Sequence, residues 1–305
     1  MTRHVVLGTG AVGAALVRRL VSDGHEVTAV NRSGSRGRLP DAAALRAGDV
    51  TDRAFLDSVV AGAAVVHQVT QPAYHRWEAE FPALQRAVLG AASRAGAAVV
   101  LADNLYAYGP PDGVIDAATP ERPTTRKGRV RAAMAAEALA AHRAGRVRVA
   151  LSRPSNYVGD GYAVMEELVF GPARAARVMR FLGRLDVPHS WSAPADAART
   201  MAAIAEAGAW GRAWIAPTLE PVTARELARR VWAAAGRSGD PKVQGLRGMP
   251  MRVLGVADRR LRESAEMMYE FDEPFVVDAS ATEAALGVRA SAWDEVIARS
   301  LVRAH

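Results

Sequence analysis

Short apolar runs alternate with longer amphipathic segments over the first half of the chain. The apolar runs place hydrophobic residues at consecutive positions, which is typical of strands buried on both faces of a parallel sheet. These predicted strands are HVVLG (4–8), HEVTAV (25–30), AAVVHQV (63–69), AAVVLAD (97–103) and RVRVALS (146–152). The segments between them have helical periodicity and cover residues 12–22, 51–61, 78–95 and 126–144, with Thr51 or Asp52 as the N-cap of the second. This alternation predicts right-handed crossovers and a Rossmann-type, doubly wound parallel sheet, which is an α/β fold.

The pattern becomes irregular after residue 155. A segment rich in Gly, Tyr and Met (156–172) is followed by a predicted helix near 194–207, a strand near 212–216 and helices near 223–235 and 291–303. We therefore expect a dinucleotide-binding Rossmann domain over residues 1–155, to which residues 190–216 return, and a C-terminal helix over residues 291–305. Residues 156–189 and 217–290 are expected to form a smaller, substrate-binding cap over the ends of the strands.

Composition excludes several kinds of protein. Half of the 305 residues are hydrophobic, so the chain can form a substantial core and disorder is not expected. The absence of cysteine excludes disulfides, thiolate metal sites and a cysteine nucleophile. His, Asp and Glu show no ligand spacing such as H-E-x-x-H, so no metal site is predicted.

The net charge of +7 comes almost wholly from arginine, since Lys127 and Lys242 are the only lysines. Basic clusters at 174–184 and 225–262 could attract phosphates, although biased codon usage explains them more simply. They show no pattern of nucleic-acid binding, so nucleic acid is not an expected partner. The basic, apolar N-terminus looks like a secretory signal, but its glycine spacing favours a strand that turns into a helix. No uncharged run reaches the roughly 20 residues that span a bilayer, so we predict a cytoplasmic protein without a membrane partner.

A glycine-rich turn lies directly between the first strand and the first helix. VVLGTGAVGAALVRRL places Gly8, Gly10 and Gly13 in G-x-G-x-x-G spacing, with Ala11 and Val12 inside the turn. The first glycine allows the tight turn, the second lets the backbone approach a pyrophosphate, and the third allows close helix–strand packing. A merely tight turn is the alternative. The strand–helix context favours a dinucleotide site formed by all five residues.

The end of the second strand indicates which dinucleotide is bound. An acidic residue usually stands there in NAD enzymes, but HEVTAVNRSGSRGR has Asn31 in that slot, followed by Arg32, Ser33 and Arg36. Guanidinium and hydroxyl groups bind a 2′-phosphate, which a carboxylate would repel. The pattern therefore predicts NADP(H) rather than NAD(H), with a solvated basic loop as the alternative.

Further motifs follow in an order that resembles the extended short-chain dehydrogenases/reductases, also called the NAD-dependent epimerase/dehydratase family. They are AGDVTD (47–52), YAYGPP (106–111), LSRPSNYVGDG (151–161), SAPADAARTMAAI (192–204), which matches only at Asp196 and Ala198, and FVVDASATEAALG (275–287). The resemblance spans the chain and implies that Asp49 contacts the adenine and that residues 151–161 line the nicotinamide and substrate region. It also implies cofactor contacts from Val50, Gln68 and Asn156.

The chain differs from the family at the positions of the family's catalytic residues. The family's Tyr-x-x-x-Lys pair falls on Lys127 and Arg131 within ERPTTRKGRVRAAMAAE, which contains no tyrosine. The serine or threonine that accompanies the pair is replaced by Asn104, and Leu7 takes the first glycine slot of the extended members. The resemblance therefore does not supply a proton donor.

The replacement residues and their neighbours could still bind the cofactor and transfer a proton. Lys127 and Arg131 lie one helical turn apart, so both can face the cofactor. Arg131 is expected to hold the ribose or a phosphate, because a guanidinium stays charged, whereas Lys127 could act as an acid or base. Asn104 can donate to a developing oxyanion, and Tyr106, after the fourth predicted strand, is a replacement acid. The alternative is that Lys127 and Arg131 form a solvated first helical turn.

Aromatic and polar residues near the strand ends are candidates for the substrate crevice. Ligands in open α/β sheets bind outside the carboxyl ends of the strands. The candidates that share this placement are Tyr74, Trp77, Tyr108, Tyr157, His189 and Trp191.

Three functions fit the sequence. The first is an NADP(H)-dependent oxidoreductase or epimerase that acts on a small carbonyl or hydroxyl compound with an altered proton donor. The second is a non-redox lyase, isomerase or cyclase that keeps a structural or internally cycling dinucleotide, and the third is an NADP-sensing regulator. The expected partner is a small-molecule substrate, and a homodimer is compatible with the sequence.

Overall fold

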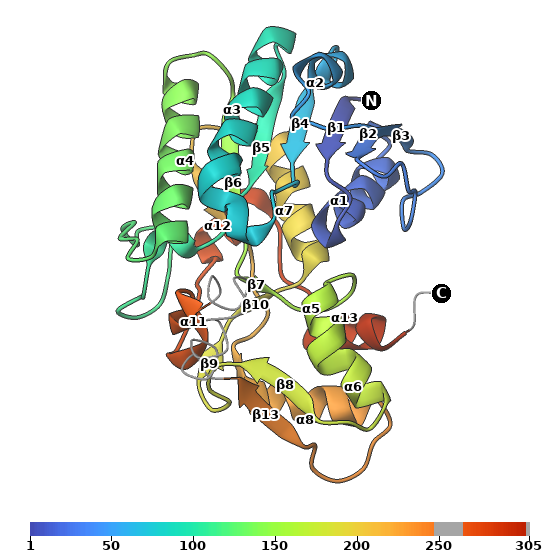
Figure 1. Ribbon diagram of the computed structural model, residues 1–305, viewed down its shortest axis with the longest axis vertical. Coiled ribbons are helices and arrows are strands. Elements are labelled where there is room, and N and C mark those ends of the chain that lie inside the picture. The colour runs from blue at the N-terminus through green and yellow to red at the C-terminus, as the bar shows by residue number, and fades with distance from the viewer. Residues whose placement is uncertain (247–264, 303–305) are drawn as a thin grey trace.

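A seven-stranded, wholly parallel sheet forms the centre of the first part of the molecule (Figure 1). The computed structural model describes residues 1–246 and 265–302. Successive strands to either side of β1 follow the doubly wound pattern predicted from sequence. In spatial order the strands are β11 (Ala213–Ile215), β6 (Val149–Arg153), β5 (Ala98–Ala102), β4 (Val65–Gln68), β1 (Arg3–Leu7), β2 (Glu26–Asn31) and β3 (Ala44–Ala47).

Helices cover both faces of this sheet and form two cores. Alternate strand residues contribute to each core: Val5 and Leu7 face one side, and Val6 faces the other. One face is covered by α2 (Arg53–Val60), α3 (Trp77–Ala95) and α4 (Arg126–Arg143), and the other by α1 (Ala11–Ser22) and α7 (Pro194–Glu206). Burial on both faces explains why the strands are continuously apolar in the sequence.

The strand order reverses between β1 and β4, which pair side by side with Val5 opposite Val66. Their chain continuations leave in opposite directions, so a crevice opens outside the carboxyl ends of these two strands. The turn after β1 and the loop after β4 therefore form the two sides of the natural ligand position in this fold.

Most predicted elements agree with the structure. All five predicted strands and all four helices of the first half are present, and Asp52 caps α2 by accepting hydrogen bonds from Ala54 N at 2.9 Å and Phe55 N at 3.2 Å. The prediction missed β3, whose sequence ALRA is largely exposed at the sheet edge and carries no apolar run. An edge strand of this kind forms because its neighbour offers hydrogen bonds, which a hydrophobic pattern does not record.

The second part of the molecule packs around its own core below the sheet (Figure 1). In it β8 (Met179–Leu182) pairs in parallel with β13 (Val243–Leu246). The helical elements are α5 (Ala163–Met165), a π-helical turn (Glu166–Phe170), α6 (Gly171–Arg174), α8 (Ala224–Ala234) and α13 (Trp293–Leu301). The predicted C-terminal helix thus packs in this part, and residues 303–305 of that prediction lie outside the described residues.

Short strands and one apolar cluster connect the two parts. The strand pairs are β7 (Asn156–Tyr157) with β10 (Trp191–Ser192), and β9 (Pro188–His189) with β12 (Val222–Thr223). Two short helices follow the undescribed segment, α11 (Tyr269–Asp272) and α12 (Ser280–Leu286), and α12 packs on α7 of the first part. The predicted cap of 217–290 includes residues 247–264, which lie outside the described residues, so the division into domains stays a prediction. None of the helices within 1–246 and 265–302 has the length and apolarity that a bilayer crossing requires.

Candidate functional site

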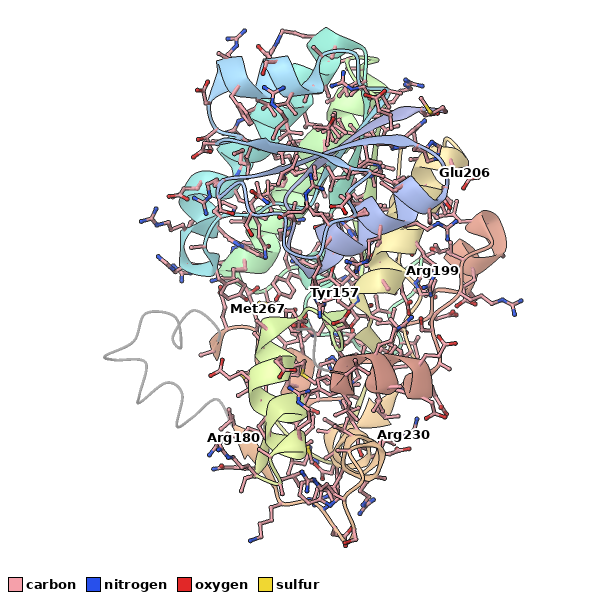
Figure 2. All side chains as sticks on the ribbon, turned by 90° about the vertical axis from the view of Figure 1, so that its right-hand side faces the viewer. Tyr157, Arg180, Arg199, Glu206, Arg230 and Met267 are labelled. Atoms are coloured by element: carbon pink, nitrogen blue, oxygen red, sulfur yellow. The ribbon has the colours of Figure 1, made fainter. Side chains whose placement is uncertain are left out.

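A cleft of about 300 Å³ lies outside the carboxyl ends of β1, β4 and β5 and extends to the second part of the molecule. One end is lined by Gly10 to Gly13 of the glycine turn. The other end is lined by polar and aromatic side chains from separate segments, namely Tyr74, Tyr106, Asn156, Tyr157, Tyr162 and Glu270. In Figure 2, Tyr157 and Met267 mark the junction of the two parts, where this end lies.

A larger cavity of about 760 Å³ lies elsewhere, between α6 and the end of α13. It is bordered by Arg38, Asp160, Glu166 and Arg174, and two ion pairs, Arg38–Asp160 and Arg174–Glu166, join these side chains. The smaller cleft is the better candidate site, because it combines the helix N-terminus of the glycine turn with convergent polar groups.

The three glycines of the turn serve different purposes. Gly8 has a φ of +107°, and a Cβ there would lie 2.8 Å from Thr70 N, while a Cβ at Gly13 would lie 2.0 Å from the Gly8 carbonyl oxygen. A Cβ at Gly10, in contrast, would meet nothing within 4 Å. Gly8 and Gly13 are therefore required by packing, whereas Gly10 keeps open the space that a pyrophosphate would fill.

The helix that follows the turn is prepared for an anion. Helix α1 begins at Ala11 with Gly10 as its N-cap, and no side chain caps its first N–H groups and no acidic residue lies in its first turn. Those N–H groups attract a negative charge. The residues present thus fit a dinucleotide. Of the five residues predicted to bind it, Gly10, Ala11, Val12 and Gly13 line the cleft and Gly8 does not, and their contacts with a cofactor stay predictions.

The loop after β2 is organised by Asn31. Its Nδ2 donates to Thr9 Oγ1 at 2.9 Å and to Ser35 O at 2.8 Å, and its Oδ1 accepts from Gly34 N at 2.7 Å. Asn31 therefore ties this loop to the glycine turn.

The basic residues of that loop differ in their surroundings. Arg36 donates to the carbonyl oxygens of Pro40 and Ala43 at 2.9 and 3.1 Å, so its guanidinium holds the loop together. Arg32 and Ser33 are exposed beside it. Of the predicted 2′-phosphate ligands, Arg32 and Ser33 are exposed, whereas Arg36 would have to give up its backbone partners; their contacts with a phosphate stay predictions.

The predicted adenine-side residues follow at the next two strand ends. Asp49 accepts from Thr51 N at 2.9 Å and Thr51 Oγ1 at 2.8 Å, and these bonds, with the nearby Arg32, lower the pKa of its carboxyl. Val50 packs against the core, and Gln68 is buried at the end of β4. Their contacts with a cofactor stay predictions.

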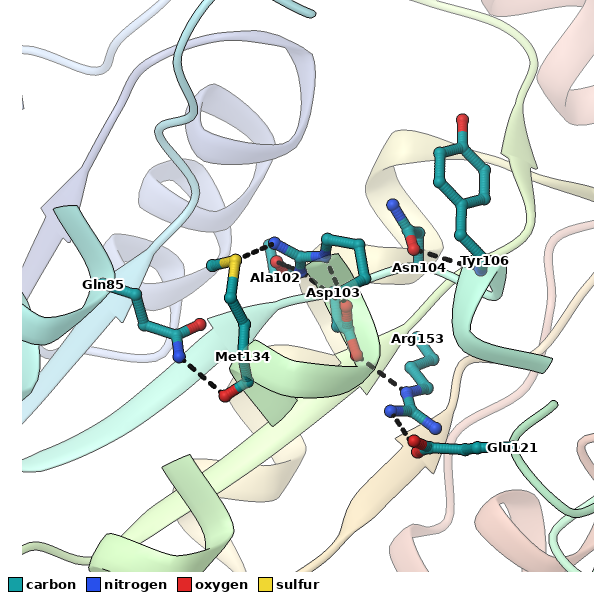
Figure 3. Close-up of polar contacts among 9 residues, drawn as sticks. Gln85, Ala102, Asp103, Asn104, Tyr106, Glu121, Met134 and Arg153 are labelled. Carbon is teal, nitrogen blue, oxygen red and sulfur yellow. Dashed lines mark hydrogen bonds and ion pairs between the residues drawn. The ribbon is translucent and has the colours of Figure 1, made fainter. Parts of the chain in front are cut away.

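A buried network of charges lies beside the cleft. Asp103, at the end of β5, accepts from Arg131 Nε at 2.8 Å and from Arg153 Nε at 2.7 Å, and Arg153 Nη2 lies 2.7 Å from Glu121 Oε1 (Figure 3). Burial alone would raise the pKa of Asp103, but the two guanidinium groups hold it below its usual value. The carboxylate therefore stays ionised and is a structural anchor, not a proton donor.

This network changes the expected role of Arg131. Its guanidinium is bound to Asp103, donates to the Ala102 carbonyl at 2.9 Å, and lies 4.6 Å from the centroid of the Phe81 ring. It borders the cleft, so a contact with the ribose stays a prediction. Its established partner is the strand end, which it holds in place.

Lys127 does not line the cleft. Its Nζ lies 3.2 Å from Glu266 Oε1 and 4.4 Å from the centroid of the Tyr74 ring. The prediction that Lys127 faces the cofactor finds no support in this arrangement, in which the ammonium lies against the Tyr74 ring and not in the cleft. The alternative of a solvated helical turn is also wrong, because Lys127 and Arg131 are only 4% and 3% exposed.

Asn104 and Tyr106 line the cleft as predicted, but each has a local partner. Asn104 Oδ1 accepts from Tyr106 N at 3.1 Å, and the Tyr106 phenol lies beside that of Tyr74 in the lining of the cleft. Burial raises the pKa of Tyr106 well above its usual value and raises that of Tyr74 as well. Both phenols therefore stay neutral and serve as hydrogen-bond donors.

The predicted substrate residues divide into two groups. Tyr74, Trp77 and Tyr157 line the cleft. The other three do not: Tyr108 packs under Arg153 in the cluster that connects the two parts, Trp191 belongs to the core of the second part, and His189 is stacked 5.0 Å from Phe271. These side chains were placed by strand position alone, which does not show on which side of a short strand each one packs.

Glu270 is the residue that the sequence analysis missed. It is 1% exposed, it lines the cleft, and its Oε2 accepts from Asn156 Nδ2 at 3.2 Å. Burial raises the pKa of its carboxyl to about 8, although the bond from Asn156 opposes this. The available signal was an acid inside the apolar run MMYEF (267–271), which marks a carboxyl that is buried.

His189 contacts both Glu270 and Asn156. Its Nδ1 lies 2.9 Å from the backbone oxygen of Glu270, and its Nε2 lies 3.4 Å from Asn156 Nδ2. Burial lowers the pKa of its imidazole to about 4, so it is neutral at physiological pH. Asn156, a predicted cofactor ligand, is thus engaged by both His189 and Glu270.

Comparisons with known proteins identify the family of the chain and its fold. The profile of the NAD dependent epimerase/dehydratase family matches residues 5–214. No protein of curated function matches the sequence significantly.

Several solved structures share the fold. A candidate epimerase from Burkholderia cenocepacia has a TM-score of 0.78 at 22% identity, over 98% of this chain and 97% of that one. The dTDP-glucose 4,6-dehydratase of Streptomyces venezuelae, solved with NAD, has a TM-score of 0.78 at 20% identity over 98% and 95%. The UDP-glucose 4-epimerase of Thermotoga maritima, solved with UDP-glucose, has a TM-score of 0.77 at 14% identity over 98% and 97%.

Proposed function

Because this chain belongs to the NAD-dependent epimerase/dehydratase family, we propose that it is an NADP(H)-dependent oxidoreductase or epimerase. Its substrate would be a small carbonyl or hydroxyl compound, and its proton donor would not be the tyrosine of the usual pair. One observation supports this most strongly: a single cleft joins the glycine turn to a group of tyrosines around a buried carboxyl. A cofactor at one end and a reacting oxygen at the other would then share one cleft.

The cofactor would be held mainly by backbone. The N–H groups at the start of α1 would meet the pyrophosphate, and the open space at Gly10 would admit it. The exposed side chains of Arg32 and Ser33 would meet a 2′-phosphate, which supports NADP(H) over NAD(H). When bound, the nicotinamide would supply or accept a hydride.

The chain's own residues would shape the reacting end. The rings of Tyr74, Trp77 and Tyr157 line this end of the cleft and would displace water around a bound substrate. The neutral hydroxyls of Tyr74 and Tyr106 can donate to a substrate oxygen, because burial raises the pKa of both phenols. Asp103 stays bound between its two arginines and fixes the end of β5 under this group.

The proposal is tested by binding and then by turnover. Calorimetric titration with NADPH and with NADH should show tighter binding of NADPH, and Gly10→Val should abolish both while its circular dichroism stays native. A panel of small aldehydes, ketones and alcohols, followed by the absorbance of the reduced nicotinamide, should then identify a substrate. A folded wild-type protein that binds neither dinucleotide would contradict the proposal, and binding without turnover of any compound would move the non-redox or sensing function ahead.

A further inference from the structure

We propose that Glu270 is the group that exchanges a proton with the substrate oxygen, and that Asn156 positions its carboxyl. This inference rests on the proposed function and adds the residue that replaces the missing tyrosine. It gives the cleft the acid–base group that neither Lys127 nor Arg131 supplies, because Lys127 lies against the Tyr74 ring and Arg131 is bound to Asp103.

Glu270 is placed for this exchange by its position and its partners. Helix α11 brings it to the wall of the cleft, and its side chain is buried there. Asn156 binds one carboxyl oxygen, and among the described residues no lysine, arginine or histidine forms an ion pair with the carboxyl. No hydrogen bond between the described residues engages the second oxygen, which we assign to a ligand. A buried acid without a counter-ion is costly to ionise, and acids of this kind are concentrated at functional sites.

The orientation of Asn156 follows from the hydrogen bonds of His189. A backbone carbonyl can only accept, so His189 Nδ1 must carry the hydrogen that it donates to the Glu270 oxygen at 2.9 Å. The neutral imidazole then accepts at Nε2, and Asn156 Nδ2, at 3.4 Å, must be the donor. The second N–H of the same amide is thereby directed to Glu270 Oε2 at 3.2 Å. Asn156 and His189 thus fix the carboxyl without contributing a charge.

The groups that face Glu270 from neighbouring elements do not compete for this role. Tyr74, Tyr106, Tyr162 and Tyr269 surround it, and its charge is one of the reasons why the pKa of each phenol is raised. Among the described residues, His189 also contacts this group, and its pKa of about 4 keeps it neutral. The Lys127–Glu266 ion pair lies against the Tyr74 ring. With a pKa of about 8, Glu270 is the member of this group that gains and loses a proton near neutral pH.

The proposed step balances in both directions. In reduction, the O–H bond of Glu270 breaks as the O–H bond of the product alcohol forms, and the carbonyl carbon gains a hydride from the reduced nicotinamide dinucleotide. Glu270 is left as a carboxylate until solvent reprotonates it. In oxidation, the carboxylate accepts the hydroxyl proton while the carbon loses hydride to the oxidised dinucleotide.

The test compares NADP⁺ with NADPH and needs no substrate. The oxidised ring carries a positive charge that the reduced ring lacks, so a nearby carboxylate favours NADP⁺ only when it is ionised. Both forms carry the same 2′-phosphate, so its titration cancels in the ratio of the two dissociation constants. That ratio should shift toward NADP⁺ by roughly tenfold as the pH rises through the pKa of about 8, which is the factor for a shift of one pKa unit.

Glu270→Gln should make the ratio independent of pH, and the exposed Glu273→Gln, on the same segment, should behave like the wild type. Asn156→Ala should move the midpoint to higher pH. The hydrogen bond from Asn156 lowers the pKa of Glu270, so its loss should raise that pKa. The proposal is overturned if the ratio of the two dissociation constants is independent of pH in the wild type, or if it changes with pH equally in Glu270→Gln. If both dinucleotides bind but the ratio stays flat, only the role of Glu270 fails. If neither binds, the proposed function fails and the role of Glu270 fails with it.

Discussion

The two ends of the cleft are built in different ways. The glycine end is made of backbone from one β–α turn, in which Gly8, Gly10 and Gly13 lie within six positions. The opposite end is made of side chains on separate segments, with Tyr74, Asn156 and Glu270 nearly 200 positions apart at the extremes. The glycine end is therefore fixed by local sequence, whereas the other end exists only after both parts of the molecule have packed together. The following changes should separate the two.

The largest effect is expected from the charges under the side-chain end. Asp103→Ala leaves Arg131 and Arg153 buried without their shared carboxylate. Removing one partner of a buried ion pair costs about 3–5 kcal/mol, so the free energy of unfolding in urea should fall by that amount. Asp57→Ala, which breaks the exposed pair with Arg94, is the control and should cost about 1 kcal/mol or less. Equal losses in the two variants would show that the network does not hold this end together.

At the glycine end, the effect of a glycine-to-alanine substitution on stability should depend on its position. Gly13→Ala places a Cβ 2.0 Å from the Gly8 carbonyl oxygen, so the backbone must shift, and we expect a loss of about 2–4 kcal/mol in unfolding free energy. Gly10→Ala meets open space and should cost about 1 kcal/mol or less. Denaturant titration of both variants checks this order. A more damaging Gly10→Ala would mean that the turn is packed differently.

A buried pair of histidines in the sheet supplies a reference for pH effects. His4 on β1 and His67 on β4 lie 3.0 Å apart between Nδ1 and Nε2, and burial lowers the pKa of His4 to about 4 and that of His67 well below its usual value. A lowered folded-state pKa gives stability that is present above the unfolded value of 6.5 and is lost as the pH falls toward 4. We expect a loss of about 2–3 kcal/mol over that range. His4→Gln should flatten the acid side of the profile, and an unchanged slope would contradict it.

Glu270 should give the opposite slope. Its raised pKa means that its contribution is fully present below the unfolded value of 4.5 and is lost as the pH rises through about 8. Between pH 6.5 and 8 this amounts to about 2 kcal/mol. The unfolding free energy of Glu270→Gln should therefore fall less over this interval than that of the wild type. Parallel curves for the two proteins would show that the carboxyl does not titrate there.

The smallest effect is expected at the exposed cofactor loop. Arg32→Ala should weaken NADPH binding by about 1 kcal/mol, or about fivefold, and leave NADH binding unchanged, because the guanidinium is exposed and water competes for the phosphate. Arg36→Ala should instead weaken both dinucleotides slightly, since it loosens the loop through Pro40 and Ala43. If Arg32→Ala kept the wild-type preference for NADPH over NADH, the argument for NADP(H) as the cofactor would fail.

These contrasts explain what could be predicted from the sequence. The strands, the α1 turn and the Asp52 cap follow from local patterns, because periodicity and capping act within a few residues. Glu270 could not be found in this way, because its burial and its bond to Asn156 depend on contacts across 114 positions.

The family motif also gave only part of the answer about Lys127 and Arg131. Their spacing predicted one shared helical face, and both are buried on α4. Their partners, Glu266 and Asp103, come from elsewhere in the chain. A helical pattern records which face is buried but not which carboxylate lies against it.

The most direct test of the account is a crystal structure of the protein with NADP⁺. The account predicts the pyrophosphate against the N–H groups at the start of α1, in the open space beside Gly10, and the nicotinamide on the side of the cleft where Glu270 is held by Asn156. A dinucleotide bound in the larger cavity beside α6, or a nicotinamide turned away from Glu270, would contradict it.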